Sequence, residues 1–303
     1  MGTETTDGRI MELNDLLRAA DVDIERTLVL RHRPSETAFR KALPLLASER
    51  LDLFEAYQAY QGEPVERMFT ARMGGSLASF LSYGPGQAIY VGTYRIDGAC
   101  DLDRGAFWSE DANQQLRALG TPGWREDEVR PTRLRVDLRR TPVSEEWRGK
   151  LIVSWPPPER SWVRVAANNV MPVVAIREDS AFAAAVPRWD EMDYSWAELK
   201  VLPQRVRHAL GEWRGIYLIW DQSDGKSYVG SAYGGTNILG RWERYAATGH
   251  GGNKLLRKRT PNTFRFSILQ RTSPDLEDAE IIRLENNWKE RLHTRSPYGL
   301  NDN

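Results

Sequence analysis

The segment that most constrains the fold lies late in the chain, where two β-rich runs flank a turn. Residues 214–232 read RGIYLIWDQSDGKSYVGSA, and the Asp-Gly-Lys sequence at 224–226 is a typical hairpin signal. The pattern predicts two neighbouring antiparallel strands. It places Tyr217 on one strand and Tyr228 on the other, where two tyrosines form either a packed cross-strand pair or part of a site.

The elements after this hairpin carry further aromatic and charged residues. They are predicted as a helix, a strand and a helix, with the sequences GRWERYAATG (240–249), FRFSIL (264–269) and AEIIRLENNWKERL (279–292). Arg241 and Tyr245 are four residues apart and therefore share one face of their helix. Glu285 lies beside the apolar side of the last helix, and the chain closes with YGLNDN.

This ordered set resembles the GIY-YIG nuclease family over about residues 213–303. The matching elements are GIY, YVG, RWERY, a glutamate within LENNWKERL and a terminal GLN. The resemblance implies an α/β sandwich with a three-stranded antiparallel sheet, and an endonuclease that hydrolyses phosphodiester bonds with Mg²⁺ or Mn²⁺. Two departures are Val229 in place of isoleucine, which is conservative, and a longer loop at 232–239.

The resemblance also implies roles for individual residues. The implied catalytic residues are Tyr217, Tyr228, Arg241, Tyr245, His250 and Glu285, with Glu285 as the metal ligand and Asn301 as structural support. Two alternatives stay open. Glu285 could be a helix-surface glutamate paired with Lys289 at i+4, and His250 could be a loop histidine without a role.

These residue types suit phosphodiester hydrolysis. A carboxylate holds Mg²⁺ while the ion keeps most of its waters and acts as a Lewis acid. The Arg241 guanidinium offers a planar set of donors to a phosphate. A tyrosine has a free pKa of about 10, so it accepts a proton only when nearby positive charge favours the phenolate. The sequence does not decide between Tyr217 and Tyr228 as the proton acceptor.

The charge distribution points to a nucleic-acid partner. The whole chain has 42 basic and 42 acidic residues, but residues 213–303 hold fourteen Lys and Arg against ten Asp and Glu. A basic stretch at 241–259 is typical of a DNA-facing surface, and a solvated helix face is the alternative. We expect DNA contacts from Arg244, Lys254, Arg257 and Lys258.

The sequence of the preceding two-thirds of the chain indicates an architecture that differs from that of the C-terminal segment. Residues 1–64 have helical patterning, residues 65–178 are β-rich, and residues 179–212 form a connection followed by a helix over 197–210. FLSYGPGQAIYVGTYRI within the β-rich region weakly resembles the opening of PUA-like barrels, which include EVE and SRA base-recognition modules. The expected fold class is therefore α+β, with N-terminal helices, a small barrel and the C-terminal sandwich.

A proline-rich turn in the β-rich region carries a second candidate contact with DNA. Arg160 and Trp162 follow three consecutive prolines. Arginine and tryptophan on such a loop can grip a phosphate or stack on an extruded base.

Composition narrows the class of protein. Hydrophobic residues make up 41% and charged residues 28%, which argues against wholesale disorder and against a coiled coil. The single cysteine excludes an internal disulfide framework and a CxxC zinc site. The chain shows no secretory signal and its apolar runs are too short to span a bilayer, so we expect a cytoplasmic protein without a membrane partner.

The sequence thus predicts a Mg²⁺-dependent DNA endonuclease of restriction or defence type, including modification-dependent enzymes, whose N-terminal half selects the target. One site cuts one strand per visit, so a homodimer on DNA is a possible arrangement. A repair or mobile-element nuclease is the alternative within enzymes. A regulatory DNA-binding protein with a decayed nuclease domain is the alternative outside them, and decay usually removes the arginine or the glutamate.

Overall fold

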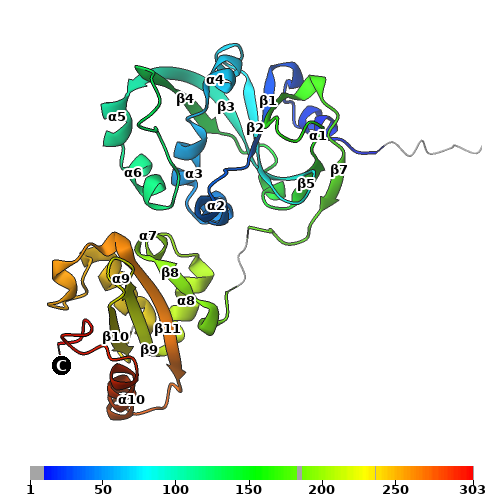
Figure 1. Ribbon diagram of the computed structural model, residues 1–303. Helices are drawn as coiled ribbons and strands as arrows, with labels where there is room; N and C mark the ends of the chain where they lie inside the picture. Colours follow the sequence, from blue (N-terminus) through cyan, green and yellow to red (C-terminus); the bar gives the residue numbers. More distant parts are fainter. Residues whose placement is uncertain (1–9, 183–185, 236, 303) are drawn as a thin grey trace, which may run out of the picture. The chain divides into compact units, whose positions relative to one another are not determined.

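The computed structural model describes residues 10–182, 186–235 and 237–302, which fall into two units. The N-terminal unit is Met1–Ala183 and the C-terminal unit is Ala184–Asn303. Each unit has its own sheet and its own hydrophobic core, so each is described separately (Figure 1). Along the described ranges, no helix is long and apolar enough to cross a membrane.

A seven-stranded sheet forms the centre of the N-terminal unit, in the order β6-β1-β2-β3-β5-β7 with β4 also paired to β3. Its strands are β1 (Thr27–His32), β2 (Ser76–Ser82), β3 (Gln87–Asp103), β4 (Thr132–Arg140), β5 (Leu151–Ser154), β6 (Val163–Val165) and β7 (Val173–Ile176). All pairings are antiparallel except β1 with β2, which run parallel. The long β3 pairs with β2, β4 and β5, so it connects most of the sheet.

Helices surround this sheet. They are α1 (Leu13–Ala19), α2 (Thr37–Glu49), α3 (Leu51–Gln58), α4 (Glu63–Thr70), α5 (Arg104–Ser109) and α6 (Asp111–Ala118). In α2, the apolar residues Phe39, Leu43 and Leu46 follow helical spacing, and all three are buried. Helix α6 packs on α3 and on α5, and α5 also packs on β3.

The helical region expected over residues 1–64 also contains a strand. β1 is buried along its whole length and pairs with β2 and β6. Its sequence, TLVLRH, has three consecutive apolar residues and no alternation, which is typical of a strand buried on both faces. The expected separation of 1–64 from 65–178 is therefore wrong, because these segments share one sheet.

The expected PUA-like barrel is not confirmed. The two ends of the sheet, β6 and β7, do not pair with each other within the described ranges, so the strands form a curled, open sheet (Figure 1). Strand β1, from the segment expected to be helical, pairs parallel with β2.

The C-terminal unit is built on a four-stranded antiparallel sheet in the order β10-β9-β11-β8. Its strands are β8 (Asp193–Ser195), β9 (Arg214–Asp221), β10 (Ser227–Ala232) and β11 (Phe264–Thr272). Its helices are α7 (Trp196–Leu199), α8 (Gln204–Glu212), α9 (Asn237–Thr248) and α10 (Asp278–Arg291). The predicted hairpin, the strand over 264–269 and the two flanking helices are present.

Two expectations about this unit are wrong in detail. The sheet has four strands rather than three, because β8 pairs with β11 at its edge. A three-residue strand is too short for its side chains to show alternation, so the sequence gives no signal for it. The helix expected over 197–210 is divided into α7 and α8, with Pro203 between them, because proline removes a backbone donor and clashes with the preceding turn.

The two faces of the C-terminal sheet are covered by different helices. Tyr217 and Ile219 of β9 pack in a cluster with residues of α8 and α9, including Trp242. On the other face, Ile216 and Val229 pack against Ile281 of α10. The strand at the free edge, β10, therefore has α9 over one face and α10 over the other.

Candidate functional site

Three tyrosines meet on the α9 face of this sheet. Tyr217 lies opposite Gly230 in the β9–β10 register, so Tyr217 and Tyr228 are diagonal neighbours on one face. Tyr245 of α9 completes the group, with ring centroids 6.1 Å from Tyr217 and 6.4 Å from Tyr228. The hydroxyl oxygens of Tyr217 and Tyr245 are 3.3 Å apart. The predicted tyrosine pair is thus part of a cluster of three.

Gly230 makes room for this cluster. A Cβ atom at this position would lie 2.4 Å from the Tyr217 hydroxyl oxygen, which is closer than real contacts allow. The glycine of the YVG sequence is therefore required by the approach of Tyr217, independently of any turn.

Burial dominates the ionisation of all three tyrosines. Burial raises the pKa of Tyr217, Tyr228 and Tyr245, and it is the largest cause of the shift for each of them. The positive charge of Arg241 lowers the pKa of Tyr217 and Tyr228, while the carboxylate of Glu285 raises both. All three side chains are neutral phenols at pH 7, and Arg241 and Glu285 are close enough to influence two of them.

Arg241 is placed one helical turn before Tyr245 on α9. It is half-buried, and it has no hydrogen bond or ion pair with another residue that the structure describes. Glu243 on the same helix is instead paired with Arg207. Arg241 is therefore the cation of this site whose donors are available to a phosphate.

Glu285 approaches edge strand β10 from the α10 face. One carboxylate oxygen accepts a hydrogen bond from the Ser231 hydroxyl, and the other lies 2.8 Å from Nζ of Lys289. The pairing with Lys289 at i+4 is therefore present. Glu285 is nonetheless not a surface glutamate, because its side chain is 16% exposed and that of Lys289 is 3% exposed.

Asn301 holds the outer side of the edge strand. Its amide nitrogen donates to the Val229 carbonyl at 2.8 Å, and its amide oxygen accepts from the Val229 N–H at 3.0 Å. These bonds satisfy backbone groups that an edge strand would otherwise leave without strand partners. Asn301 is buried in this position.

This arrangement agrees with a comparison against known families. The family model of the GIY-YIG catalytic domain matches residues 214–298, which contain the tyrosine cluster, Arg241 and Glu285. Through this domain the chain belongs to the GIY-YIG nuclease family. The chain is thus an enzyme of a nuclease family, and its C-terminal unit contains the catalytic domain.

Solved structures with similarity to this domain come from a homing endonuclease. The catalytic domain of homing endonuclease I-TevI is 30% identical, with a TM-score of 0.26, over 30% of this chain and 98% of that chain. A glutamate-to-alanine mutant of the catalytic domain of intron endonuclease I-TevI is 29% identical, with a TM-score of 0.25, over 29% of this chain and 92% of that one. A comparison with curated proteins gives no match.

The loop after α9 passes beside the tyrosine cluster, because a Cβ atom at Gly251 would lie 2.4 Å from the Tyr245 ring. His250 is in the loop after α9, where its Nδ1 accepts a hydrogen bond from the Gly252 N–H at 3.0 Å. No hydrogen bond or ion pair joins it to the tyrosines, Arg241 or Glu285 in the part of the chain that the structure describes. A catalytic role for His250 stays a prediction.

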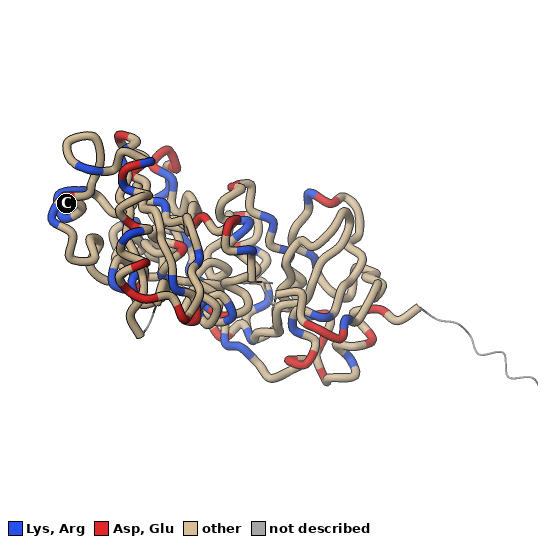
Figure 2. The backbone as a smooth tube through the Cα atoms, turned by 90° about the horizontal axis from the view of Figure 1, so that it is seen from below, with Lys and Arg blue, Asp and Glu red and all other residues tan. Residues whose placement is uncertain are grey.

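The predicted DNA-contacting cations of this domain are on its surface. Arg244, Arg257 and Lys258 are exposed, and Lys254 is 82% exposed with Asp302 at 3.9 Å. Figure 2 shows basic residues beside the C-terminal end of the chain. Arg259 of the same basic stretch differs, because it pairs with Asp221 at 2.6 Å and with Asp224 at 2.8 Å.

The N-terminal candidates are exposed on the loop between β5 and β6. Arg160 is exposed, and Trp162 is 51% exposed. The Trp162 carbonyl accepts a hydrogen bond from the Arg31 N–H at 2.7 Å, which ties this loop to β1.

The sequence reasoning missed Ser231, and it treated Lys289 only as an alternative partner of Glu285. Ser231 directly follows the YVG sequence on the side of β10 opposite to the tyrosines. Strand alternation predicts that side, but not that α10 packs there. The position of Ser231 next to the motif was the one available signal.

The residues available as ligands indicate which kind of metal ion this site suits. The described ranges hold no group of three or more His, Cys, Asp or Glu residues suited to a metal ion, so Glu285 would be a single carboxylate ligand. This fits Mg²⁺, which is commonly held by one or two carboxylates and keeps several waters. The carboxylate has about four acceptor positions, so the bonds to Ser231 and Lys289 leave room for a cation.

Proposed function

We propose that this protein is a divalent-metal-dependent DNA endonuclease whose C-terminal unit cuts and whose N-terminal unit selects the target. The observation that carries the proposal is the convergence of three tyrosines, Arg241 and Glu285 around edge strand β10 within a GIY-YIG catalytic domain. Both the arginine and the glutamate are present, which argues against a decayed nuclease that only binds DNA.

In the proposed mechanism, Tyr228 reacts in its phenolate form and accepts the proton of the attacking water. Tyr228 is half-buried and Tyr217 is fully buried, so of the two motif tyrosines Tyr228 is the one that water reaches. Tyr217 and Tyr245 pack against it and fix its ring. Arg241 contributes positive charge that favours the Tyr228 phenolate, and its donors bind the phosphoryl oxygens.

Glu285 is the residue that would hold Mg²⁺ or Mn²⁺ in this mechanism. The bound cation would act as a Lewis acid at the leaving 3′-oxygen and would neutralise the carboxylate that raises the pKa of Tyr228. Ser231 and Lys289 orient the carboxylate, and Asn301 holds the strand that carries Tyr228 and Ser231.

Surface cations of the C-terminal unit would hold the DNA, and the N-terminal unit would choose the target. Exposed Lys254, Arg257 and Lys258 provide phosphate contacts, and Arg244 adds another basic side chain on α9. A separate N-terminal unit gives the enzyme a means to choose its target, as a cytoplasmic restriction or defence nuclease does. A single site with one catalytic glutamate cuts one strand per visit, so a double-strand break needs two chains or two visits.

Plasmid cleavage by the full chain tests the proposal. With Mg²⁺, we expect nicking of supercoiled DNA that EDTA abolishes, and matched plasmids with unmodified, methylated or hydroxymethylated cytosine report any requirement for modification. Glu285→Ala should remove cleavage while DNA binding is largely retained, because the carboxylate serves the metal rather than the duplex. Glu290→Ala, on the same helix and 70% exposed, is the matched control. Undiminished turnover by Glu285→Ala in Mg²⁺ would contradict the proposal.

A further inference from the structure

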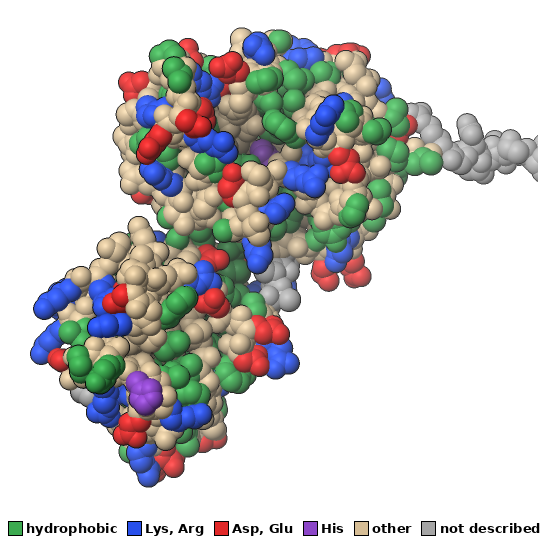
Figure 3. All heavy atoms as spheres, in the orientation of Figure 1, with side chains coloured by type: hydrophobic (Ala, Val, Ile, Leu, Met, Phe, Trp, Pro, Cys, Tyr) green, Lys and Arg blue, Asp and Glu red, His purple; other side chains and the backbone are tan. Residues whose placement is uncertain are grey.

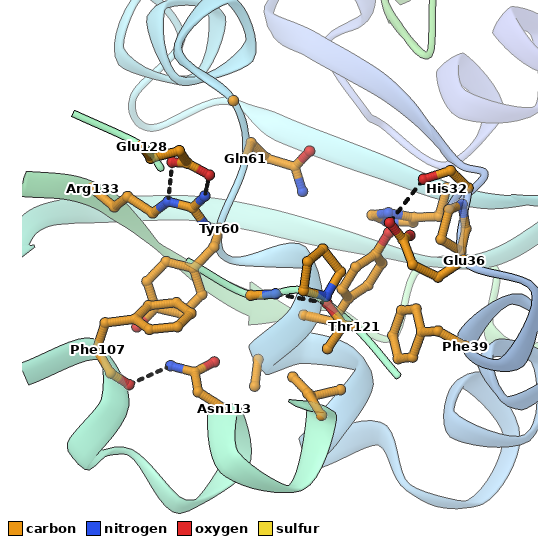
Figure 4. Close-up of a pocket in the computed structure, with 18 of the residues that line it drawn as sticks. His32, Glu36, Phe39, Tyr60, Gln61, Phe107, Asn113, Thr121, Glu128 and Arg133 are labelled. Carbon is orange, nitrogen blue, oxygen red and sulfur yellow. Dashed lines mark hydrogen bonds and ion pairs between the residues drawn. The ribbon is translucent and has the colours of Figure 1, made fainter. Parts of the chain in front are cut away.

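The N-terminal unit contains a cavity that the nuclease chemistry does not use. It has a volume of about 670 Å³ and is lined by the end of β1, by α2 and α3, and by residues between Phe107 and Arg133. Figure 3 shows that this unit is hollowed on the face viewed there, and Figure 4 shows the lining side chains. Cavities of this size are typical of sites for small organic ligands.

Aromatic rings form two walls of the cavity. Phe39 and Tyr57 contact each other with ring centroids 4.8 Å apart, and Tyr60 and Phe107 contact each other at the same distance. Phe39 and Phe107 lie on opposite sides in Figure 4, with Thr121 between them. The Tyr60 hydroxyl donates to Glu110 at 2.7 Å, which holds that wall in place. Such walls suit a flat ring system.

Polar atoms without protein partners line the same cavity. His32 is 4% exposed, and its Nε2 is buried without a hydrogen-bond partner among the described residues. Arg31 precedes His32 on β1 and its side chain points to the opposite face, where the guanidinium lies 4.7 Å from the centre of the Trp155 ring and donates to the Glu159 carbonyl. Gln61 donates from its side chain to the Gln58 carbonyl at 2.9 Å, which leaves its side-chain oxygen for another contact. Buried polar groups are normally hydrogen-bonded, so unpaired ones in a cavity point to a polar ligand.

The rim of the cavity carries exposed apolar side chains. Trp162 is 51% exposed and Val129 is fully exposed, and both line the cavity. A protein that extrudes a base commonly inserts an apolar side chain into the stack that the base leaves. Trp162 also offers a ring on which a base can stack.

We propose that this cavity receives one nucleobase of the DNA substrate, turned out of the duplex, and that this base is part of the target selected by the enzyme. The aromatic walls enclose the ring, His32 and Gln61 provide hydrogen bonds to its edge, and Trp162 and Val129 face the remaining duplex. The inference rests on the proposed function and gives the N-terminal unit a specific site.

Mapped cleavage ends test this site with the full chain. The wild-type protein should cut a pool of random-sequence DNA, prepared with unmodified or hydroxymethylated cytosine, at ends that share a preferred base. Trp162→Ala and Gln61→Ala should reduce the preference for that base by roughly 5- to 150-fold, as expected for one lost base contact. Val174→Ala, 48% exposed on β7 and outside the cavity lining, is the control.

Binding provides a second test that does not depend on cleavage. A mismatched base is easier to extrude, so Glu285→Ala should bind a duplex with one mismatch more tightly than the matched duplex. Adding Trp162→Ala or Gln61→Ala should remove that difference, and thermal unfolding confirms that each variant is folded. An unchanged base preference together with an unchanged mismatch effect overturns the cavity proposal and leaves the nuclease proposal intact. Absence of cleavage by the wild-type protein contradicts the nuclease proposal, and the mismatch measurement still decides the role of the cavity.

Discussion

The catalytic site and the N-terminal cavity are assembled in different ways. The tyrosine cluster comes from one hairpin and the helix that follows it, so strand pairing and helical spacing bring Tyr217, Tyr228, Arg241 and Tyr245 together. The cavity collects side chains from positions as distant in sequence as His32 and Trp162. Local patterns therefore reveal the first site, while the second depends on how distant segments pack.

The largest expected effect is on turnover, and it comes from removing the tyrosine hydroxyls. This change distinguishes catalytic tyrosines from tyrosines that only pack in the core. Tyr228→Phe and Tyr217→Phe each remove only a hydroxyl, and we expect turnover to fall by about 100- to 10,000-fold, the range for loss of a general acid–base group. The loss should be greater for Tyr228→Phe because Tyr228 is the more accessible hydroxyl. Single-turnover cleavage rates measure this.

Tyr298→Phe is the matched control, since Tyr298 is 80% exposed in the same unit. If both motif variants cut at near-normal rates, the tyrosines are core residues and the catalytic site lies elsewhere.

A smaller effect on stability distinguishes Arg259 from the other cations of the basic stretch. Hydrogen bonds from Ser223, Arg259 and Thr263 outweigh the burial of Asp221 and lower its pKa to about 2. The contribution of ionised Asp221 to the free energy of unfolding is fully present above the ordinary pKa of an aspartate. It is lost as pH falls through about 2. Arg259→Ala leaves a buried carboxylate without its cation, so we expect a loss of about 3 kcal/mol in the free energy of unfolding.

Urea unfolding at pH 7 measures this loss, with the neighbouring exposed Lys258 changed to alanine as the control. Equal stability of the two variants would show that the Asp221–Arg259 pair does not hold the domain together.

A pH effect is expected from the N-terminal unit. Burial lowers the pKa of His32 to about 4, against an opposing effect of Gln58. The unfolded chain takes up this proton below the ordinary pKa of about 6.5, so stability is full above that pH and falls as pH drops towards 4. We expect His32 to account for about 2 kcal/mol of lost stability between pH 7 and 5.

Thermal unfolding across this range should show a flatter acid dependence for His32→Gln than for His208→Gln, whose histidine is exposed on α8. Identical pH profiles for the two variants would contradict the role assigned to buried His32.

Sequence patterns predicted the C-terminal fold well because its signals are local. The hairpin, α9, β11 and α10 appear where turn residues and apolar spacing indicate them, and the GIY-YIG match confirms the domain. The bond from Ser231 to Glu285 depends on which helix covers each face of β10, and the three residues of β8 are too few for a pattern. The segments beside β1 have helical spacing, so the pattern of residues 1–64 does not reveal this strand.

The smallest expected effect concerns nonspecific DNA contacts. Changing exposed Lys254, Arg257 and Lys258 to alanine should weaken binding similarly across DNA sequences, without affecting the fold. Each lost phosphate contact should reduce the slope of log K against log salt by about 0.9. Binding measured over a salt series reports this slope, and an unchanged slope would identify the stretch as a solvated surface.

The division of labour between the units is tested most directly by mapping the cleavage sites of the full chain and of a fragment that contains residues 184–303. The fragment retains β8, which a fragment beginning at residue 196 would lack. We predict selective cutting by the full chain and weak nicking without sequence preference by the fragment, because the base-recognition cavity is in the N-terminal unit. A fragment that cuts the same sites as the full chain would contradict this account.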